Sequence, residues 1–179
     1  MDWVLPVLTT ERLRLRAVTM EDAEALFAYG SNPQVTQYVL WETHQTLDDA
    51  KGFIDMILDA YETRGLYLWG IEYEGKFIGT IDYVGLNDYS KIGEIGYVLS
   101  EDYWNKGIIT EAAKRIIDFG FTELGLVRIQ ARCIAENMAS SRVMEKSGMI
   151  LEGTHRKSLF AKGRHYDVHM YAIIDYDRG

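Results

Sequence analysis

Cysteine and proline are scarce in this sequence, which contains one cysteine and two prolines among its 179 residues. A single cysteine, Cys133, excludes a disulfide within the chain, which suits a cytoplasmic protein. No apolar run approaches the roughly 20 residues that a membrane-spanning helix needs. The N-terminus lacks the basic and apolar regions of a signal peptide. We therefore expect a cytoplasmic globular protein with long, regular helices and strands.

Positive charge is also in short supply. The chain carries 19 Lys and Arg against 27 Asp and Glu, for a net charge of −8. Nucleic-acid binding requires a basic surface, so this balance argues against it. An acidic surface favours cationic partners instead, such as amines or basic proteins. The length suits one hydrophobic core, and we expect a single domain over residues 1–179.

The hydrophobic pattern predicts an α+β protein with a mixed, mostly antiparallel seven-stranded sheet and about four helices. The long helix that follows Gly107 is flanked by two strand-like runs, which a right-handed crossover could join in parallel. A second helix is predicted to start after Thr46 and to stop at Gly65. The predicted strands are residues 12–18, 66–73, 76–87, 91–100, 127–134, 151–162 and 164–174.

The stretch "YWNKGIITEA", residues 103–112, forms an unusual entrance to the long helix. The first amides of a helix have no partner within it and carry the positive end of the helix dipole, so they can hold phosphate. Gly107 lets the backbone approach a ligand closely, and Lys106 adds a cation. An ordinary capped helix behind a tight turn explains the same residues. The P-loop pattern and a helix-opening Gly-x-Gly-x-x-Gly are both absent.

Several fragments, in this order, resemble the GNAT acetyltransferases, and especially their RimJ/RimL-like N-acetyltransferase branch. The fragments are "TERLRLR", "GEIGYVLS", "YWNKGIITEA", "NMASSRVMEKSGM" and "LEGTHRKSLF…GRHYDVHMYAI". The resemblance implies a GNAT-type sheet and transfer of an acetyl group from acetyl-CoA to a primary amine, without a metal.

The resemblance also implies where acetyl-CoA binds. Its diphosphate would lie on the amides of a loop whose family pattern, Gln/Arg-x-x-Gly-x-Gly/Ala, is matched here only at the central glycine. Its pantetheine arm would pair with the backbone of the preceding strand, where the Val98 N–H could polarise the thioester carbonyl. These strand residues are also compatible with an ordinary sheet. The implied cosubstrate-binding residues are Tyr97, Val98, Leu99, Asn105, Lys106, Gly107, Ile108, Ile109, Thr110, Asn137 and Ser140.

Two residues are candidates for moving protons. Glu94 lies four residues before Val98, at the register where other GNAT enzymes carry a glutamate base, which could act directly or through water. A solvated strand glutamate is the alternative. Many GNAT enzymes place a tyrosine acid where this chain has Met144. The resemblance instead assigns Ser140 to the leaving thiol, although it could be an ordinary hydroxyl near a helix start.

The acceptor is the least defined part of the sequence-based prediction. The resemblance favours the α-amine of a protein N-terminus. A small amine (a polyamine, an amino acid or an antibiotic) and a non-catalytic acyl-CoA-binding module are the alternatives, and a homodimer is left open. The four histidines lack a cysteine or carboxylate cluster that would complete a metal site. Residues expected to line the acceptor pocket are Tyr38, Trp41, His44, His165, Tyr166 and Asp167.

Overall fold

The computed structural model describes residues 3–177, which group into two compact units. The first unit contains the chain up to Asp82 together with Tyr97–Ile108. The second contains Tyr83–Gly96 and the chain from Ile109 onward. Each unit is described separately below.

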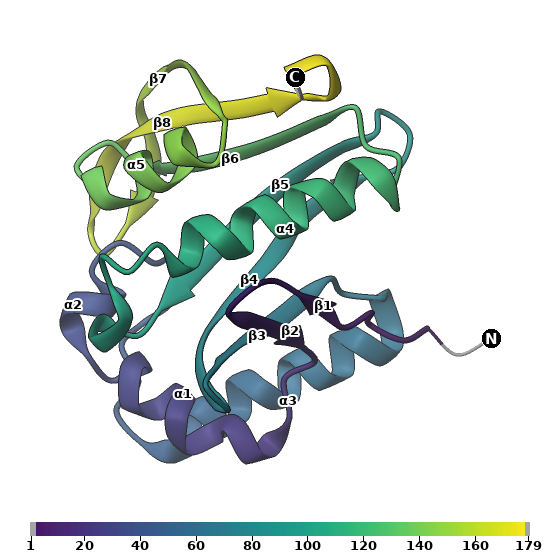
Figure 1. The fold of residues 1–179 in the computed structure, drawn as a ribbon. Coiled ribbons are helices and arrows are strands. Elements are labelled where there is room, and N and C mark those ends of the chain that lie inside the picture. Colours follow the sequence, from purple (N-terminus) through teal and green to yellow (C-terminus); the bar gives the residue numbers. More distant parts are fainter. Residues whose placement is uncertain (1–2, 178–179) are drawn as a thin grey trace. The chain divides into compact units, whose positions relative to one another are not determined.

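One eight-stranded sheet runs through the described residues in the order β1-β2-β3-β4-β5-β6-β8-β7 (Figure 1). The pairing is antiparallel between β1 and β2, β2 and β3, β3 and β4, β6 and β8, and β7 and β8, whereas β5 and β6 run parallel, as the sequence predicted. The strands are β1 (Leu8–Thr9), β2 (Leu13–Arg16), β3 (Leu68–Tyr73), β4 (Lys76–Asn87), β5 (Ile92–Leu99), β6 (Arg128–Ile134), β7 (Ile150–Ala161) and β8 (Arg164–Ile174).

The predicted strand count of seven was wrong by one, because the sequence pattern did not reveal β1. This strand has only two residues, and it pairs Leu8 with Leu15 of β2. A two-residue strand is too short to display the alternation by which strands are recognised. The α+β class and the mostly antiparallel sheet are confirmed.

Helices α1, α2 and α3 belong to the first unit. They span Ala23–Gly30, Pro33–Thr36 and Leu47–Arg64. The Thr46 hydroxyl caps α3 by accepting from the Asp49 N–H, and Gly65 ends the helix in a left-handed conformation, as predicted. A buried cluster joins α1 and α3 to the sheet, and it includes Val18, Leu26, Tyr29, Ala50, Ile54, Ile57, Leu68 and Phe77.

The second unit contains α5 (Met138–Lys146) and all of α4 (Ile108–Thr122) except its first residue. Tyr83 of β4 is buried, and its hydroxyl donates a 2.7 Å hydrogen bond to the carbonyl of Ile116 in α4. Gly120, one turn further along α4, leaves room for that tyrosine and for Ile129 of β6. Helix α4 and the sheet residues of this unit are therefore packed too closely to admit a side chain at position 120.

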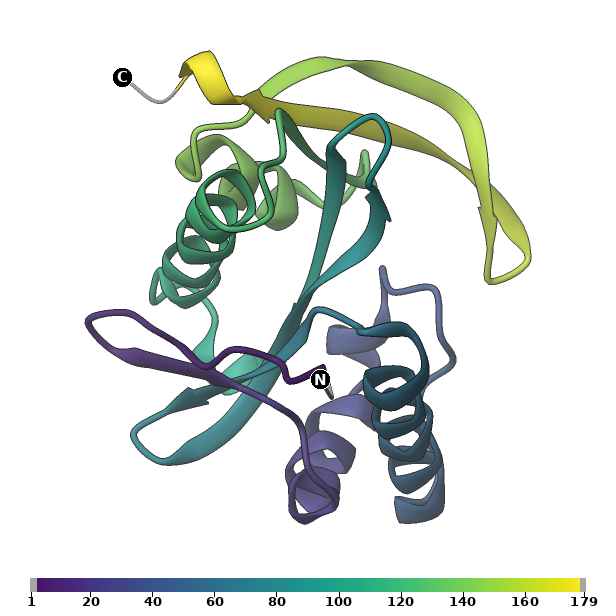
Figure 2. The same cartoon turned by 90° about the vertical axis from the view of Figure 1, so that its right-hand side faces the viewer.

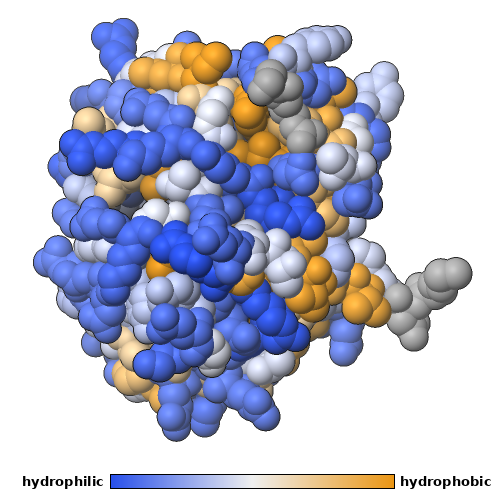
Figure 3. Space-filling view, in the orientation of Figure 1, coloured by the Kyte–Doolittle hydropathy of each residue, from blue (hydrophilic) through white to orange (hydrophobic). Residues whose placement is uncertain are grey.

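The surface carries both polar and apolar side chains. On the face drawn in Figure 3, hydrophilic side chains predominate and apolar ones form smaller areas between them. No helix among residues 3–177 is both long enough and apolar enough to cross a bilayer.

Replacement of Gly120 by alanine should destabilise the protein, although alanine is the better helix former by about 1 kcal/mol. An added Cβ would lie 2.8 Å from the Ile129 Cδ1 and closer still to the Tyr83 hydroxyl. Such overpacking typically costs about 1–3 kcal/mol. The matched control is Gly52→Ala in α3, where nothing lies within 4 Å of the new atom and a gain in stability is expected. Urea unfolding of both variants checks this, and stabilisation by Gly120→Ala would contradict the packing described.

Asp82 of β4 makes the stability of the fold depend on pH. Its carboxylate has no hydrogen-bond or ion-pair partner among residues 3–177, and burial raises its pKa to about 7. As the pH rises, the unfolded chain loses the proton of this carboxyl near its ordinary pKa of about 3.9, whereas the folded protein keeps the proton until a higher pH. This contribution to stability is complete below about pH 4 and is lost as the pH rises to about 7.

Asp82→Asn should remove this loss of unfolding free energy at higher pH, because asparagine carries no proton that titrates. We expect the variant to exceed the wild type by about 2 kcal/mol in unfolding free energy at pH 8, with a smaller difference at pH 4. The partial exposure of the side chain keeps the expected value below that of a fully buried acid. Asp88→Asn, in the exposed turn after β4, is the control for the change in charge. A difference that stays constant between pH 4 and pH 8 would refute the assignment.

Candidate active site

The turn between β5 and α4 has the backbone that the sequence suggested for an anion site. Asn105 and Gly107 both adopt positive φ angles, of 61° and 72°. Asparagine tolerates this left-handed conformation better than most residues, and glycine adopts it freely. Helix α4 begins at Ile108. The amides of Ile108, Ile109 and Thr110 thus lie in its first turn, where N–H groups lack partners within the helix.

Side chains from three places hold this turn in shape. The Trp104 indole N–H donates to the Leu99 carbonyl at 2.9 Å. Arg12, in the loop between β1 and β2, donates to the Lys106 carbonyl at 3.0 Å. The Lys106 ammonium donates to the Asp102 carbonyl at 2.9 Å. The role of Arg12 could not be predicted, because it lies 94 residues away from its partner in the chain.

The ring of Tyr103 gives the Lys106 side chain a second contact. The ammonium lies 5.1 Å from the centre of that ring, close enough for a cation–π interaction. The expected cation is therefore present beside the turn. Its position is set by the Glu101–Tyr103 helical turn that precedes it.

The end of β5 lies against β4 with almost no space between the backbones. The Ser100 N–H donates to the Ile78 carbonyl at 2.8 Å. A Cβ at Gly79 would lie 3.0 Å from the Leu99 Cα and closer still to the Val98 carbonyl oxygen. Only glycine fits there. Tyr97 and Val98 are half-buried, whereas Leu99 is buried and its carbonyl is already bonded to Trp104.

Glu94 is held at both of its carboxylate oxygens. Its side chain is 16% exposed, and Arg132 of β6 lies 2.8 Å from Oε1. Gln130 lies opposite Glu94 in the parallel β5–β6 register and donates to Oε2 at 2.8 Å. The Arg132 guanidinium thus places a positive charge beside this side chain. Sequence reasoning found Glu94 but not these two partners, because strand register brings them together.

Asn137 and Ser140 together form the start of α5. The Asn137 side-chain oxygen accepts from the Ser140 N–H at 3.2 Å, which caps the helix. This leaves the two hydrogens of the Asn137 amide for other partners. Ser140 is half-buried, and Met144, which stands where the family's tyrosine acid would be, is 2% exposed.

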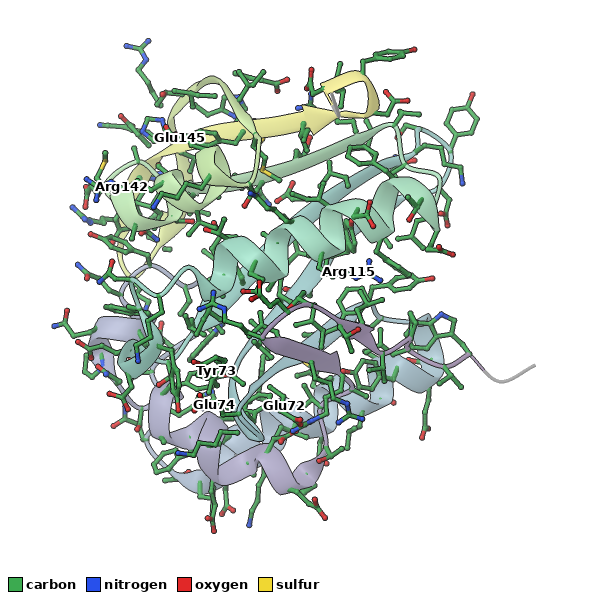
Figure 4. The ribbon with its side chains drawn as sticks, in the orientation of Figure 1. Glu72, Tyr73, Glu74, Arg115, Arg142 and Glu145 are labelled. Atoms are coloured by element: carbon green, nitrogen blue, oxygen red, sulfur yellow. The ribbon has the colours of Figure 1, made fainter. Side chains whose placement is uncertain are left out.

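Cys133 of β6 lies beneath the start of α5. Its Sγ is 3.4 Å from the Ser141 hydroxyl. Burial raises the pKa of the Cys133 thiol, and hydrogen bonds from Ser141 and Ser140 oppose that effect. The helix is also fixed to β8, since the Tyr171 hydroxyl donates to Glu145 at 3.2 Å. Figure 4 labels Glu145 and Arg142 on this helix.

The residues predicted to line the acceptor pocket fall into two groups. In the first unit, the His44 ring is buried and lies 5.0 Å from Trp41 and 6.1 Å from Phe53. Burial lowers the pKa of His44, and its Nδ1 has no hydrogen-bond partner among the described residues. In the second unit, His165, Tyr166 and Asp167 line a hollow of about 360 Å³.

The candidate residues are divided between the two units. Glu94, Ile109, Thr110, Asn137 and Ser140 belong to the second unit, and Tyr97–Leu99 and Asn105–Ile108 belong to the first. Strand β5 carries residues of both. Among residues 3–177 no three His, Cys, Asp or Glu side chains are grouped so that they could hold a metal.

Comparison with known proteins identifies the fold and the family. Residues 12–150 match the acetyltransferase (GNAT) domain family. The chain is 35% identical over 173 residues to the uncharacterized N-acetyltransferase YoaA of Bacillus subtilis, covering 96% of this chain and 98% of YoaA. A crystal structure of a GNAT-family acetyltransferase from Bacillus anthracis superposes with a TM-score of 0.84 at 32% identity, over 96% of this chain and 99% of that one.

Two more distant similarities concern proteins whose names state an acceptor. RimL, a ribosomal L7/L12 α-N-protein acetyltransferase solved with coenzyme A, has the same fold at 21% identity and a TM-score of 0.85, covering 94% of this chain and 98% of RimL. The spermidine N(1)-acetyltransferase of Escherichia coli K12 is 27% identical over 86% of this chain and 81% of that protein.

The matches to YoaA and to the Bacillus anthracis structure each cover 96% of this chain. The chain belongs to the GNAT family of acetyltransferases, enzymes that transfer an acetyl group from acetyl-CoA.

Proposed function

We propose that residues 1–179 act as one cytoplasmic N-acetyltransferase domain that transfers the acetyl group of acetyl-CoA to the α-amine of a polypeptide N-terminus. The observation that carries the proposal is the left-handed turn at Asn105 and Gly107 leading into α4. A turn of this shape followed by unpartnered helix amides binds phosphate oxygens without needing a lysine-rich site.

The cosubstrate is proposed to lie along the chain from β5 into α4. Its diphosphate accepts from the amides of residues 105–110, and its pantetheine arm pairs with the backbone of Tyr97 and Val98. The Leu99 carbonyl is bonded to Trp104, so it is not proposed as an acceptor for the arm. Gly107 suits this role, since the atom closest to a Cβ there is the Arg12 guanidinium, at 3.7 Å.

The chemical step is proposed to use Glu94 and Ser140. The amine nitrogen attacks the thioester carbon, a C–N bond forms, and the C–S bond breaks. Glu94 takes the proton that the amine loses, directly or through one water, and the Ser140 hydroxyl donates a hydrogen bond to the leaving thiolate. A thiol with a pKa near 8.5 needs little help to leave, so a neutral hydroxyl is sufficient.

An α-amine is the preferred acceptor for two reasons. Its pKa near 8 leaves about a tenth of it neutral at pH 7, whereas a lysine amine is almost wholly protonated. RimL, whose structure matches 94% of this chain, is named as an acetyltransferase of the α-amine of a ribosomal protein. The spermidine N(1)-acetyltransferase similarity favours a second candidate function, acetylation of a polyamine.

Gly107→Ala should weaken coenzyme A binding at least tenfold, which corresponds to about 1.4 kcal/mol. The methyl group strains the left-handed backbone and turns the amides away from the diphosphate. The matched control is Gly75→Ala, since Gly75 has a φ of 74°, close to the 72° of Gly107, but lies in the β3–β4 hairpin. Isothermal titration calorimetry measures both. Equal affinity of the two variants for coenzyme A would count against the proposed diphosphate site.

Glu94→Gln should lower kcat for a peptide acceptor at pH 7 by about 100-fold or more, because general bases contribute on this scale. The deficit should shrink above pH 8, where most of the α-amine is neutral without a base. Thiol release from acetyl-CoA, measured from pH 6 to pH 9 against peptide, polyamine and aminoglycoside acceptors, checks both expectations.

The control for this variant is Glu152→Gln. Glu152 is also ion-paired with an arginine of β6, with its Oε1 2.7 Å from Arg128, but it lies on β7 outside the proposed site. We expect it to keep wild-type kcat. If the pH–rate profile of Glu94→Gln matches that of the wild type, Glu94 is not the base. If no amine is acetylated while coenzyme A still binds, the chain is a binding module.

A further inference from the structure

The tip of the β7–β8 hairpin is basic in a chain that is acidic overall. Residues 155–165 contain two histidines, two arginines and two lysines but no Asp or Glu, whereas the whole chain has a net charge of −8. We call residues 155–165 the basic tip. Its four permanent cations, Arg156, Lys157, Lys162 and Arg164, are exposed. Concentrated positive charge attracts an anionic partner from solution and orients it.

The backbone of the basic tip departs from a regular hairpin. The pairing of β7 with β8 is irregular between His155 and Leu159, and Lys157 has a φ of 49°. The Lys157 N–H donates to the Asp167 carboxylate at 2.8 Å, which fixes the bulge. Bulges of this kind re-aim side chains and are found next to functional sites. Figure 2 displays the hairpin as a long curved ribbon.

The basic tip adjoins the proposed catalytic helix within the second unit. The hollow of about 360 Å³ is lined by Lys157, His165 and Asp167 from the hairpin and by Ala135 and Glu136 from the end of β6. The Ala135 N–H donates to the Asp167 carbonyl at 2.9 Å. The chain then continues directly to Asn137 and into α5. Strand β8 lies between β6 and β7, so the bulge is about 10 Å from the end of β6, at roughly 5 Å per strand.

Two acidic groups and one exposed aromatic ring lie beside the cations of the basic tip. Glu136 lies 2.8 Å from Arg164, and the Asp167 carboxylate accepts from the Lys157 backbone. Phe160 adds apolar surface, since it is 63% exposed and its ring lies 5.0 Å from that of His165. This combination of cations and exposed aromatic surface suits a peptide.

We propose that the basic tip binds an acidic segment of the acceptor polypeptide, a few residues after the amine that is acetylated. The proposal rests on the proposed function and names the acceptor class. An extended peptide advances about 3.3 Å per residue, so three to four residues span about 10 Å. The acidic residues therefore lie at about the third to sixth positions of the acceptor. A polyamine, which is cationic, is repelled by the same surface.

The test uses two octapeptides that begin with Ser-Ala and carry at positions three to six either four glutamates or four glutamines. With wild-type enzyme we expect the acidic peptide to have about tenfold lower KM, with kcat equal within about twofold. The preference should disappear at 0.5 M salt, where screening is strong. Arg156→Glu and Lys157→Asn should each raise the KM of the acidic peptide severalfold and leave the neutral peptide unchanged.

Lys76→Glu is the matched control, because it reverses an exposed charge at the β3–β4 turn in the other unit. It should leave both peptides unaffected. Unchanged turnover of the neutral peptide by Arg156→Glu also demonstrates that this variant is folded. Equal KM values for the two peptides, or a rise in the dissociation constant of coenzyme A in Arg156→Glu, would overturn the proposal. The latter result would assign the cations to the cosubstrate.

A binding experiment separates this proposal from the proposed function. Fluorescence anisotropy of the labelled acidic peptide, with coenzyme A present, needs no acetylation. If the peptide binds in a way that depends on Arg156 but is not acetylated, the docking surface stands and the α-amine function fails. If it does not bind, or if a single-stranded RNA of equal charge binds more tightly through Arg156, the docking proposal is wrong.

Discussion

The left-handed backbone at Asn105 and Gly107 is the constraint on which the proposed activity depends. It connects the end of β5 to the first turn of α4, where the N–H groups lack partners within the helix. The turn does not hold this shape alone. Trp104 bonds it to the last carbonyl of β5, and Arg12 bonds it to a strand-connecting loop near the N-terminus. Backbone N–H groups that are held in place before the cosubstrate arrives can bind its diphosphate without a cluster of charged side chains.

Strand β5 carries both the proposed base, Glu94, and a residue proposed to contact pantetheine, Val98. Glu94, near its start, has both oxygens occupied by Arg132 and Gln130. Val98, near its end, lies against Gly79, where no side chain fits. The position of Glu94, the proposed base, and the backbone at Val98, proposed to contact pantetheine, are therefore set by different neighbours.

Much of the fold could be predicted because its signals are local. The Thr46 cap and the Gly65 terminus of α3 follow from residues within one turn of each other. The β3–β4 and β7–β8 turns contain Gly75 and Gly163, which both adopt the positive φ angles that glycine allows. The parallel pairing of β5 with β6 follows from the crossover helix. Strand β1 escaped prediction because two residues carry no periodicity.

The candidate site was predictable only in part. The resemblance named Glu94, Asn137, Ser140 and the turn before α4 as candidates. It could not supply the partners that distinguish a positioned residue from an ordinary one, since Arg12, Gln130 and Arg132 reach their contacts through strand register or across many residues. The basic tip is visible in the sequence as a run of cations, but its position beside the start of α5 follows from the pairing of β6, β8 and β7.

The central claim, that acetyl-CoA is held by the amides of the turn before α4, is tested most directly by hydrogen–deuterium exchange with and without coenzyme A. The account predicts that the amides of residues 105–110 become strongly protected when coenzyme A is added, together with those of Tyr97 and Val98. Protection confined to other segments, with the exchange of residues 105–110 unchanged at saturating coenzyme A, would contradict it.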